Sequence, residues 1–385
     1  MKVINTERVP IKIWADDAED SAVQQAKNLA NLPFVRKWVA IMADTHMGYG
    51  MPIGGVIATE RVVIPNAVGV DIGCGMKARK TSLTEIGKET LKKMLNQIQR
   101  DIPTGFNHQK EEQDMSKELV ELIDQFNSTA LDDIFRKIPH QLGTLGGGNH
   151  FIEIQKGDDG HIWIMLHSGS RGIGKMTCDH YNKIAEDMNR MWYTQVDKDL
   201  AYLPLDTKEG AEYMKAMQIG MQFAEDNRLH MLEKITSILK ESFPDMEYEE
   251  SIDTHHNYAA MEHYFGKNYL VHRKGAVRAL GKVIIPGSMG TYSYIAEGLD
   301  NPESFGSCSH GAGRRMGRKE ATRQYTASEV LAEMKEKGIE LYKIKKDDVA
   351  EECAQAYKDI DAVMEDQKDL VKPLVKLRPL GVVKG

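Results

Sequence analysis

The sequence predicts an α+β protein, with residues 1–385 forming one continuous domain. Two observations lead to this prediction: short apolar runs punctuated by glycine recur along the chain, and one long stretch shows helical periodicity. These stretches do not alternate as regular β-α-β units, which distinguishes the chain from an α/β fold. No internal repeat, low-complexity tract or proline- and serine-rich linker divides it.

The predicted strands rest on alternation and on glycine-bounded apolar runs. Over residues 162–167, aliphatic Ile and Leu side chains alternate with Trp163, Met165 and His167. This period of two predicts a strand and places His167 at its end, where binding sites are common. Further short strands are predicted within 35–43, 54–58, 61–76, 269–272 and 282–286.

Helical periodicity predicts the remaining elements. A broad helical region covers 176–243, where Met214, Met217 and Met221 recur on one face. A methionine-rich stripe can bind a partner, but such a face more commonly packs in a core, so we expect it to be buried. The other predicted helices are 85–100, 115–126, 327–336 and 346–364.

Composition indicates a globular protein and limits its partners. The 41% hydrophobic content can build a sizeable core, and no apolar run is long enough for a membrane span or a secretory signal. A formal net charge of -7 argues against bulk attraction to nucleic acid but permits a local basic groove. The four cysteines form no CxxC pair, so neither a disulfide framework nor a zinc ribbon is predicted. We expect a cytoplasmic protein.

Six short segments contain the side chains that are suited to chemistry. Most of them place a metal-binding or nucleophilic group where glycine lets the backbone turn sharply. In chain order they are DTHMGYG (44–50), VGVDIGCGM (68–76), GGGNHFIE (146–153), LHSGSRGIG (166–174), THHNYA (254–259) and SCSHGAGR (307–314).

A carboxylate and a thiol three residues apart, Asp71 and Cys74, can converge on one cation. Taken alone, the pair is more commonly a capping aspartate and a buried structural cysteine. His150, His167 and His256 raise the number of possible ligands to that needed by two divalent ions bridged by the thiolate. The softness of these donors by itself favours zinc or another later transition metal.

Two segments offer groups that suit phosphate. SGSRGIG can present backbone N–H groups and the Arg171 guanidinium, although an ordinary glycine turn explains it as well. A Walker A loop is absent from the sequence. His310 lies among small residues and is followed by Arg314 and Arg315, so the segment is either a tight turn or the place where a bulky anion meets the imidazole.

The order of these six segments, together with HRKGAVRALG from His272 and the ending VVKG, resembles the RtcB family of GTP-dependent RNA ligases. The resemblance covers the whole chain. It implies one catalytic domain, with mixed sheets and peripheral helices around a dinuclear metal site. It also implies an enzyme of tRNA splicing and RNA repair that joins RNA 3′-phosphate or 2′,3′-cyclic phosphate ends to 5′-hydroxyl ends. GTP and two manganese ions are the implied cofactors, archease is a possible partner, and a monomer is expected.

The resemblance also assigns roles to individual residues. His310 becomes the nucleophile that is guanylylated, Lys384 lies near the guanine, and Arg171 contacts the RNA end or its phosphate. The implied manganese ligands are Asp71, Cys74, His150, His167 and His256, with Cys74 bridging. The implied nucleotide-binding residues are Asn149, His150, Phe151, Ile152, Glu153, His256, Asn257, Pro286, Gly287, Ser288, Met289, Ser293, His310, Gly311, Ala312, Gly313 and Lys384.

Two positions depart from the family pattern, and two rival hypotheses stay open. Ala43 replaces a proline and makes the first turn less rigid, whereas Gly317 replaces a serine and removes a hydrogen bond near the nucleotide. One rival is a dinuclear metal phosphoesterase, which would need neither His310 nor Lys384. The other is a catalytically silent RNA-binding protein, which would be expected to have lost His310 or Cys74.

Overall fold

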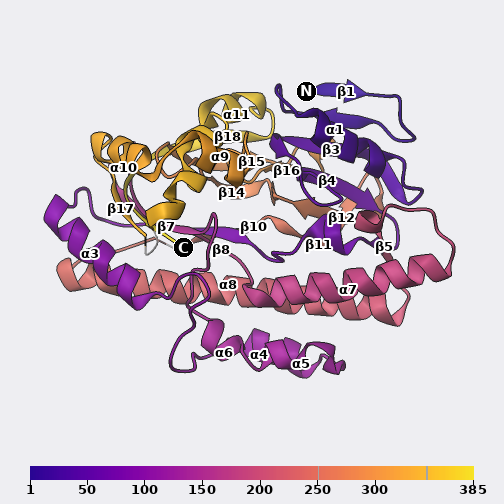
Figure 1. Ribbon diagram of the computed structural model, residues 1–385, viewed down its shortest axis with the longest axis horizontal. Coiled ribbons are helices and arrows are strands. Elements are labelled where there is room, and N and C mark those ends of the chain that lie inside the picture. The colour runs from indigo at the N-terminus through magenta and orange to yellow at the C-terminus, as the bar shows by residue number, and fades with distance from the viewer. Residues whose placement is uncertain (250, 344–345) are drawn as a thin grey trace.

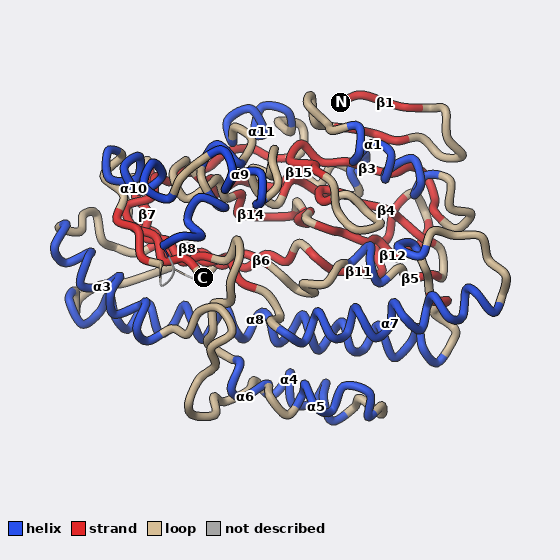
Figure 2. The backbone as a smooth tube through the Cα atoms, in the orientation of Figure 1, coloured by secondary structure: helices blue, strands red, loops and turns tan. Residues whose placement is uncertain are grey.

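Two large β-sheets occupy the middle of the molecule, and two long helices cover one side of it (Figure 1). Helices α7 (Gly172–Met191) and α8 (Lys208–Ser242) run side by side along this face. Figure 2 shows the strands gathered centrally, with the helices at the periphery. This segregation confirms the predicted α+β class. The computed structural model describes residues 1–249, 251–343 and 346–385.

The first sheet has six strands, which pair in the order β1-β2-β3-β4-β12-β11. All its pairs are antiparallel except β2 with β3. The register between β3 and β4 shifts after Ile41, so the last residues of β3 leave the regular ladder and enter the site described below. The strands are β1 (Lys2–Ile4), β2 (Ile11–Ile13), β3 (Val35–His46), β4 (Ile53–Thr59), β11 (Asn257–Tyr264) and β12 (Lys267–Lys274).

The second sheet has eight strands and determines where the site forms. Its order is β10-β6-β8-β7-β18-β15-β14, with β17 added in parallel to β18. Phe151 pairs with both His167 and Lys384, so the start of β7 and the ends of β8 and β18 meet at one edge. The strands are β6 (Gly75–Lys80), β7 (Phe151–Gly157), β8 (Ile162–Ser168), β10 (Ile252–His255), β14 (Leu280–Ile285), β15 (Ser293–Leu299), β17 (Glu340–Tyr342) and β18 (Val371–Lys384).

Two short ribbons complete the strand inventory of the described residues. In one of them Ala276 pairs with Ser309, which brings the segment that contains His310 toward the end of β12. The other ribbon pairs Val63 with Leu203. The four strands are β13 (Ala276–Arg278), β16 (Ser307–Ser309), β5 (Val62–Val63) and β9 (Leu203–Pro204).

The shorter helices surround the sheets, and none of the helices in the described ranges is long and apolar enough to cross a membrane. They are α1 (Asp20–Ala30), α2 (Pro65–Val68), α3 (Lys88–Asp101), α4 (Lys117–Asp124), α5 (Asp132–Phe135), α6 (Ile138–Gln141), α9 (Arg318–Gln324), α10 (Ala327–Glu336) and α11 (Ile360–Asp366). Short 3₁₀ helices lie at Thr129–Leu131, Lys198–Leu200, Pro302–Ser304, Lys346–Glu352 and Ala354–Ala356.

The second sheet is packed on both faces, which explains why strand β8 is buried along its whole length. Ile164 and Leu166 contribute to an apolar cluster with residues of α8, whereas Trp163 and Met165 contribute to another with residues of α10. The strand predicted at 162–167 is therefore confirmed, and both of its faces pack against apolar clusters. The predicted methionine-rich face is also confirmed as core, since Met217 is buried in a cluster between the long helices.

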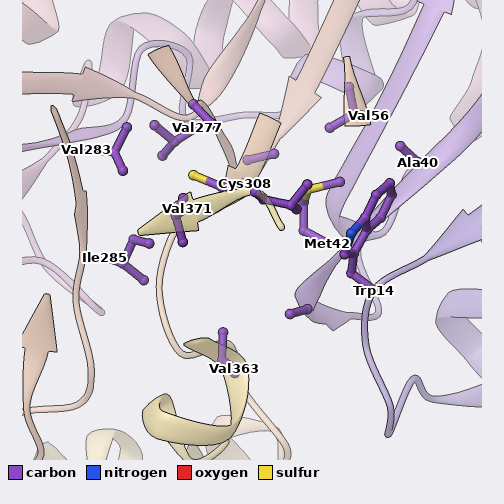
Figure 3. Packing of buried hydrophobic residues seen from close by; sticks show 14 of the residues in the cluster. Trp14, Ala40, Met42, Val56, Val277, Val283, Ile285, Cys308, Val363 and Val371 are labelled. Atoms are coloured by element: carbon purple, nitrogen blue, oxygen red, sulfur yellow. The ribbon is translucent and has the colours of Figure 1, made fainter. Parts of the chain in front are cut away.

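A further apolar cluster joins the two sheets near the site (Figure 3). Met42 lies in β3 of the first sheet, Trp14 directly follows β2 of the same sheet, and Val371 begins β18 of the second sheet. Cys308 lies among them as a small buried apolar group, two residues before His310. This core therefore anchors the strand from which His310 emerges.

Two strand and helix predictions need correction in their interiors. The run 61–76 contains the short helix α2, because Pro65 suits a first helical turn and Gly69 ends it with a φ of 97°. The helical region 176–243 is interrupted between α7 and α8 by a loop that includes β9.

The predicted helix at 346–364 is wrong except for its last five residues, which belong to α11. The chain forms two short 3₁₀ helices there, and α11 begins only at Ile360. Glu352 lies buried against cationic groups of a cavity wall, where its ion pairs determine the local path of the chain. These tertiary contacts outweigh the helical periodicity of the segment.

Candidate metal and nucleotide site

All six segments singled out in the sequence contribute to the wall of one cavity of about 850 Å³. The cavity lies where the ends of β6, β7, β8 and β18 face the segment that follows β16. Antiparallel pairing is the cause of this convergence, because it brings the start of one strand beside the end of the next. Residues remote in sequence thus meet at one edge of the second sheet.

Cys74, His150 and His167 form a buried group whose possible ligand atoms all lie within 4.8 Å of one another. The Cys74 Sγ atom is 3.2 Å from Nε2 of His167 and 3.6 Å from Nε2 of His150. Nδ1 of His150 donates a hydrogen bond to the Leu145 carbonyl at 2.9 Å, so in the neutral ring Nε2 is the nitrogen with the lone pair. Its lone pair is therefore free to bind a cation beside the thiol.

Asp71 lies beside this group. Its Oδ2 atom is 3.2 Å from Nε2 of His150, and its backbone carbonyl accepts a hydrogen bond from the Asn257 side chain. A Cβ atom at Gly169 would lie only 2.1 Å from Oδ1 of Asp71. Glycine at 169 is therefore needed for the carboxylate to reach the cluster.

His256 extends the cluster toward His310. Its ring centroid is 5.2 Å from that of His167 and 4.8 Å from that of His310. Nδ1 of His256 is buried and has no hydrogen-bond partner among the described residues. A buried nitrogen without a partner is costly unless a ligand binds it, so the donor set fits a bound divalent cation. The five predicted ligands are therefore contiguous in space.

Burial sets the protonation of this cluster. It lowers the pKa of the His167 and His256 imidazoles well below the usual range, so both rings are neutral at pH 7. Burial, reinforced by the Asp71 carboxylate, raises the pKa of the Cys74 thiol well above its usual range. Binding of a cation by the thiolate would therefore release a proton.

His310 is held by Asp44, a residue to which the sequence analysis gave no role. Oδ2 of Asp44 accepts hydrogen bonds from Nδ1 of His310 at 2.6 Å and from its backbone N–H at 3.0 Å. Asp44 is completely buried, so this pairing fixes the orientation of the ring. A Cβ atom at Gly313 would lie 2.1 Å from the Asp44 carbonyl, which explains a glycine there. The only sequence signal for Asp44 was its position in the first segment.

The implied nucleotide-binding residues divide into three groups. The side chains of Ile152, Glu153 and Ser293 are buried behind the wall, with Ile152 in a core cluster. His150 lies in the thiol and histidine cluster. The residues that line the cavity are Asn149, Phe151, His256, Asn257, Pro286, Gly287, Ser288, Met289, His310, Gly311, Ala312, Gly313 and Lys384.

The two residues at the ends of β7 and β18 illustrate the chemistry of this wall. Lys384 lies with its ammonium 5.7 Å from the Phe151 ring centroid. Behind it, burial raises the pKa of the Glu153 carboxyl to about 8, although Lys384 and a hydrogen bond from Gln155 act in the opposite direction. Glu153 is consequently neutral at pH 7, so it cannot balance the positive charge of Lys384.

The three arginines considered as phosphate contacts lie in different parts of the site. Arg314 lines the cavity, whereas Arg315 and Arg171 are not among its lining residues. The Arg171 guanidinium donates hydrogen bonds to Thr144 Oγ1 and to the Gly105 carbonyl. Its geometry therefore ties together two loops at the back of the cluster.

Several lining residues had no predicted role, among them Lys274, Arg318, Glu352 and Tyr357. Arg318, Glu352 and Tyr357 all lie outside the six glycine-rich segments. Lys274 lies in the HRKGAVRALG segment, which contributed to the family resemblance but gave this lysine no role. No local signal distinguishes Arg318, Glu352 and Tyr357, because only the fold places them at the cavity.

Comparison with known proteins identifies relatives over nearly the whole chain. A family model described as tRNA-splicing ligase RtcB matches residues 25–139 and 132–385. The chain is 39% identical over 415 residues to the RNA-splicing ligase RtcB of Escherichia coli (strain K12), covering 100% of this chain and 99% of that protein. It is 33% identical to the tRNA-splicing ligases RtcB of Methanococcus maripaludis and Thermococcus kodakarensis, over 98% of this chain and 95% of each relative.

Proposed function

The chain belongs to the RtcB family of tRNA-splicing ligases, and from this we propose that it joins RNA ends through a guanylylated His310. The proposed substrates are a 3′-phosphate or 2′,3′-cyclic phosphate end and a 5′-hydroxyl end, with GTP as the source of the guanylyl group. The observation that supports this proposal best is the position of His310. Its ring is hydrogen-bonded to Asp44 on one side and lies 4.8 Å from the ring of His256 on the other.

The first chemical step follows from the tautomer of His310. Because Nδ1–H donates a hydrogen bond to Asp44, Nε2 of the neutral ring keeps a lone pair that can attack the α-phosphorus of GTP. The new bond joins Nε2 to phosphorus, and the broken bond releases pyrophosphate. The charge on the Asp44 carboxylate stabilises the positive charge that develops on the ring.

The next steps transfer the guanylyl group. If the RNA ends in a 2′,3′-cyclic phosphate, water first opens it to a 3′-phosphate. An oxygen of that phosphate then attacks the phosphorus on His310, and the Nε2–P bond breaks. The 5′-hydroxyl of the second RNA attacks the activated 3′ end, which forms the phosphodiester bond and releases GMP. Positioning of these ends beside one imidazole supplies much of the rate.

We propose that Asp71, Cys74, His150, His167 and His256 would hold two manganese ions. The neutral rings of His167 and His256 and the unpartnered Nδ1 of His256 support this assignment. Bound divalent cations would neutralise charge on the phosphate oxygens and favour departure of pyrophosphate. The choice of manganese rests on the family resemblance, because the donor set alone favours a softer metal.

A labelling experiment tests the nucleophile. Protein incubated with α-labelled GTP and manganese should acquire acid-labile, alkali-stable label, and His310→Ala should acquire none. His263→Ala is a matched control, because His263 is an exposed histidine that bonds only Asn268. Label that persists in His310→Ala at the wild-type level would refute His310 as the nucleophile.

A ligation assay separates the proposal from its rivals. With GTP and manganese, the protein should join a 3′-phosphate RNA to a 5′-hydroxyl RNA. A phosphoesterase would instead release phosphate without GTP, and a silent binding protein would do neither. Repeating a negative assay with added archease tests the predicted partner. A role for Arg171 at the RNA end, the monomeric state and the cytoplasmic location stay predictions.

A further inference from the structure

One buried carboxylate in the cavity wall contacts three cationic side chains. Glu352 is only 2% exposed, at the end of the 3₁₀ helix Lys346–Glu352. Its Oε1 atom is 3.2 Å from both Arg314 Nη1 and Arg318 Nε. Its Oε2 atom is 3.5 Å from Lys384 Nζ and accepts a hydrogen bond from the Tyr357 hydroxyl. Both carboxylate oxygens are therefore occupied by partners within the protein.

These partners reach the carboxylate from separate parts of the fold. Arg314 follows β16, Arg318 begins α9, and Lys384 ends β18. All three cations, together with Glu352 and Tyr357, line the same cavity as His310. The Glu352 side chain thus links three wall segments, one of which, at Arg314, is also joined to Tyr357 by a backbone bridge.

Glu352 is the carboxylate that balances the positive charge of the buried Lys384. Burial alone would raise the pKa of the Glu352 carboxyl, but Lys384, Arg314 and the Tyr357 hydroxyl outweigh it and lower the pKa to about 2. Glu352 is therefore fully ionised at pH 7. A buried ammonium whose carboxylate partner is removed is left uncompensated, so it must move toward water or lose its proton.

We propose that Glu352 is a positioning residue that holds the Lys384 ammonium at the nucleotide end of the cavity and thereby sets selectivity for guanine over adenine. The inference rests on the proposed function, in which Lys384 lies near the base. Guanine presents an acceptor oxygen at its O6 position, whereas adenine presents an amino donor at the corresponding place. A fixed ammonium therefore favours guanine, and a displaced one favours neither base.

A binding measurement that does not depend on catalysis tests this role. Equilibrium binding of GTP and of ATP is measured for two proteins that both carry His310→Ala. One keeps Glu352, and the other also carries Glu352→Gln. We expect the affinity for GTP to fall at least tenfold and the affinity for ATP to change less than threefold. Glu351→Gln is the matched control, because Glu351 is the adjacent residue and contacts Arg318 at 3.8 Å but is one-third exposed. It should change neither affinity more than twofold.

A purely structural role predicts a different result. Equal losses of GTP and ATP affinity in Glu352→Gln, or losses matched by Glu351→Gln, would overturn the proposal. A double-mutant cycle provides a second test: once Lys384→Ala is present, Glu352→Gln should cost less than a further threefold in GTP affinity. Additive losses would also overturn it. If Glu352→Gln does not fold, as judged by circular dichroism, Glu352→Asp is measured by the same criteria.

The failure of this inference can be distinguished from failure of the proposed function. Protein with wild-type Glu352 that binds GTP and ATP equally would refute guanine selectivity itself, and with it this inference. Protein that selects GTP, and still does so with the same ratio in Glu352→Gln, would refute only the positioning role.

Discussion

Replacement of Asp44 by asparagine tests whether the ring of His310 is activated by its buried partner. The carboxylate accepts two hydrogen bonds from His310, at 2.6 Å from Nδ1 and 3.0 Å from the backbone N–H. A hydrogen bond to a charged group contributes about 1.5–3 kcal/mol, so its loss should slow guanylylation roughly 10- to 150-fold. An amide N–H pointing at Nδ1 would also move the ring proton to Nε2, which would add to the loss.

The assay is the single-turnover rate of label transfer from α-labelled GTP to Asp44→Asn at saturating GTP and manganese. Asp226→Asn is the control, because Asp226 is also a buried aspartate that accepts hydrogen bonds from Ser116 and Gln222 but does not line the cavity. Thermal unfolding of both variants checks their folding. A rate for Asp44→Asn within threefold of the control would refute the reasoning, because the ring would then need no orienting carboxylate.

Two other changes test the neighbourhood of the site. Gly169→Ala should displace Asp71, since the new Cβ would lie 2.1 Å from Oδ1, and should lower manganese affinity roughly tenfold or more by calorimetric titration. Gly87→Ala, which meets nothing within 4 Å, should leave the affinity unchanged, and equal affinities for both variants would contradict this explanation. Glu153→Gln should remove a pH dependence of stability. The folded-state pKa of Glu153 is raised from 4.5 to about 8, so its contribution to stability is fully present below pH 4.5 and is lost as the pH rises toward 8. The free energy of unfolding of the wild type should therefore fall by roughly 1.4 kcal/mol per pH unit in this window relative to Glu153→Gln. Parallel curves for the two proteins in denaturant titrations would show the prediction to be wrong.

Elements with strong local signals were predictable. The helix at 327–336 was predicted within its observed bounds, and the structure adds a capping box between Thr326 and Glu329 at its start. The strand at 162–167 and the buried methionine face followed from periodicity, because burial of one face leaves a repeat in the sequence. The segment 346–364 gave a misleading signal, since Glu352 there is held by partners that lie far away in the chain.

The sequence by itself determined the chemical groups of this protein. The six segments contain the thiol, the imidazoles and the small residues around His310, and their order identifies the family. What only the tertiary structure decided is which groups touch. Asp44 and His310 are 266 residues apart, and Lys384 meets Glu352 across the end of a sheet. Hydrogen bonds and ion pairs act over a few ångströms, so their partners are fixed by strand register and core packing, which no local pattern records.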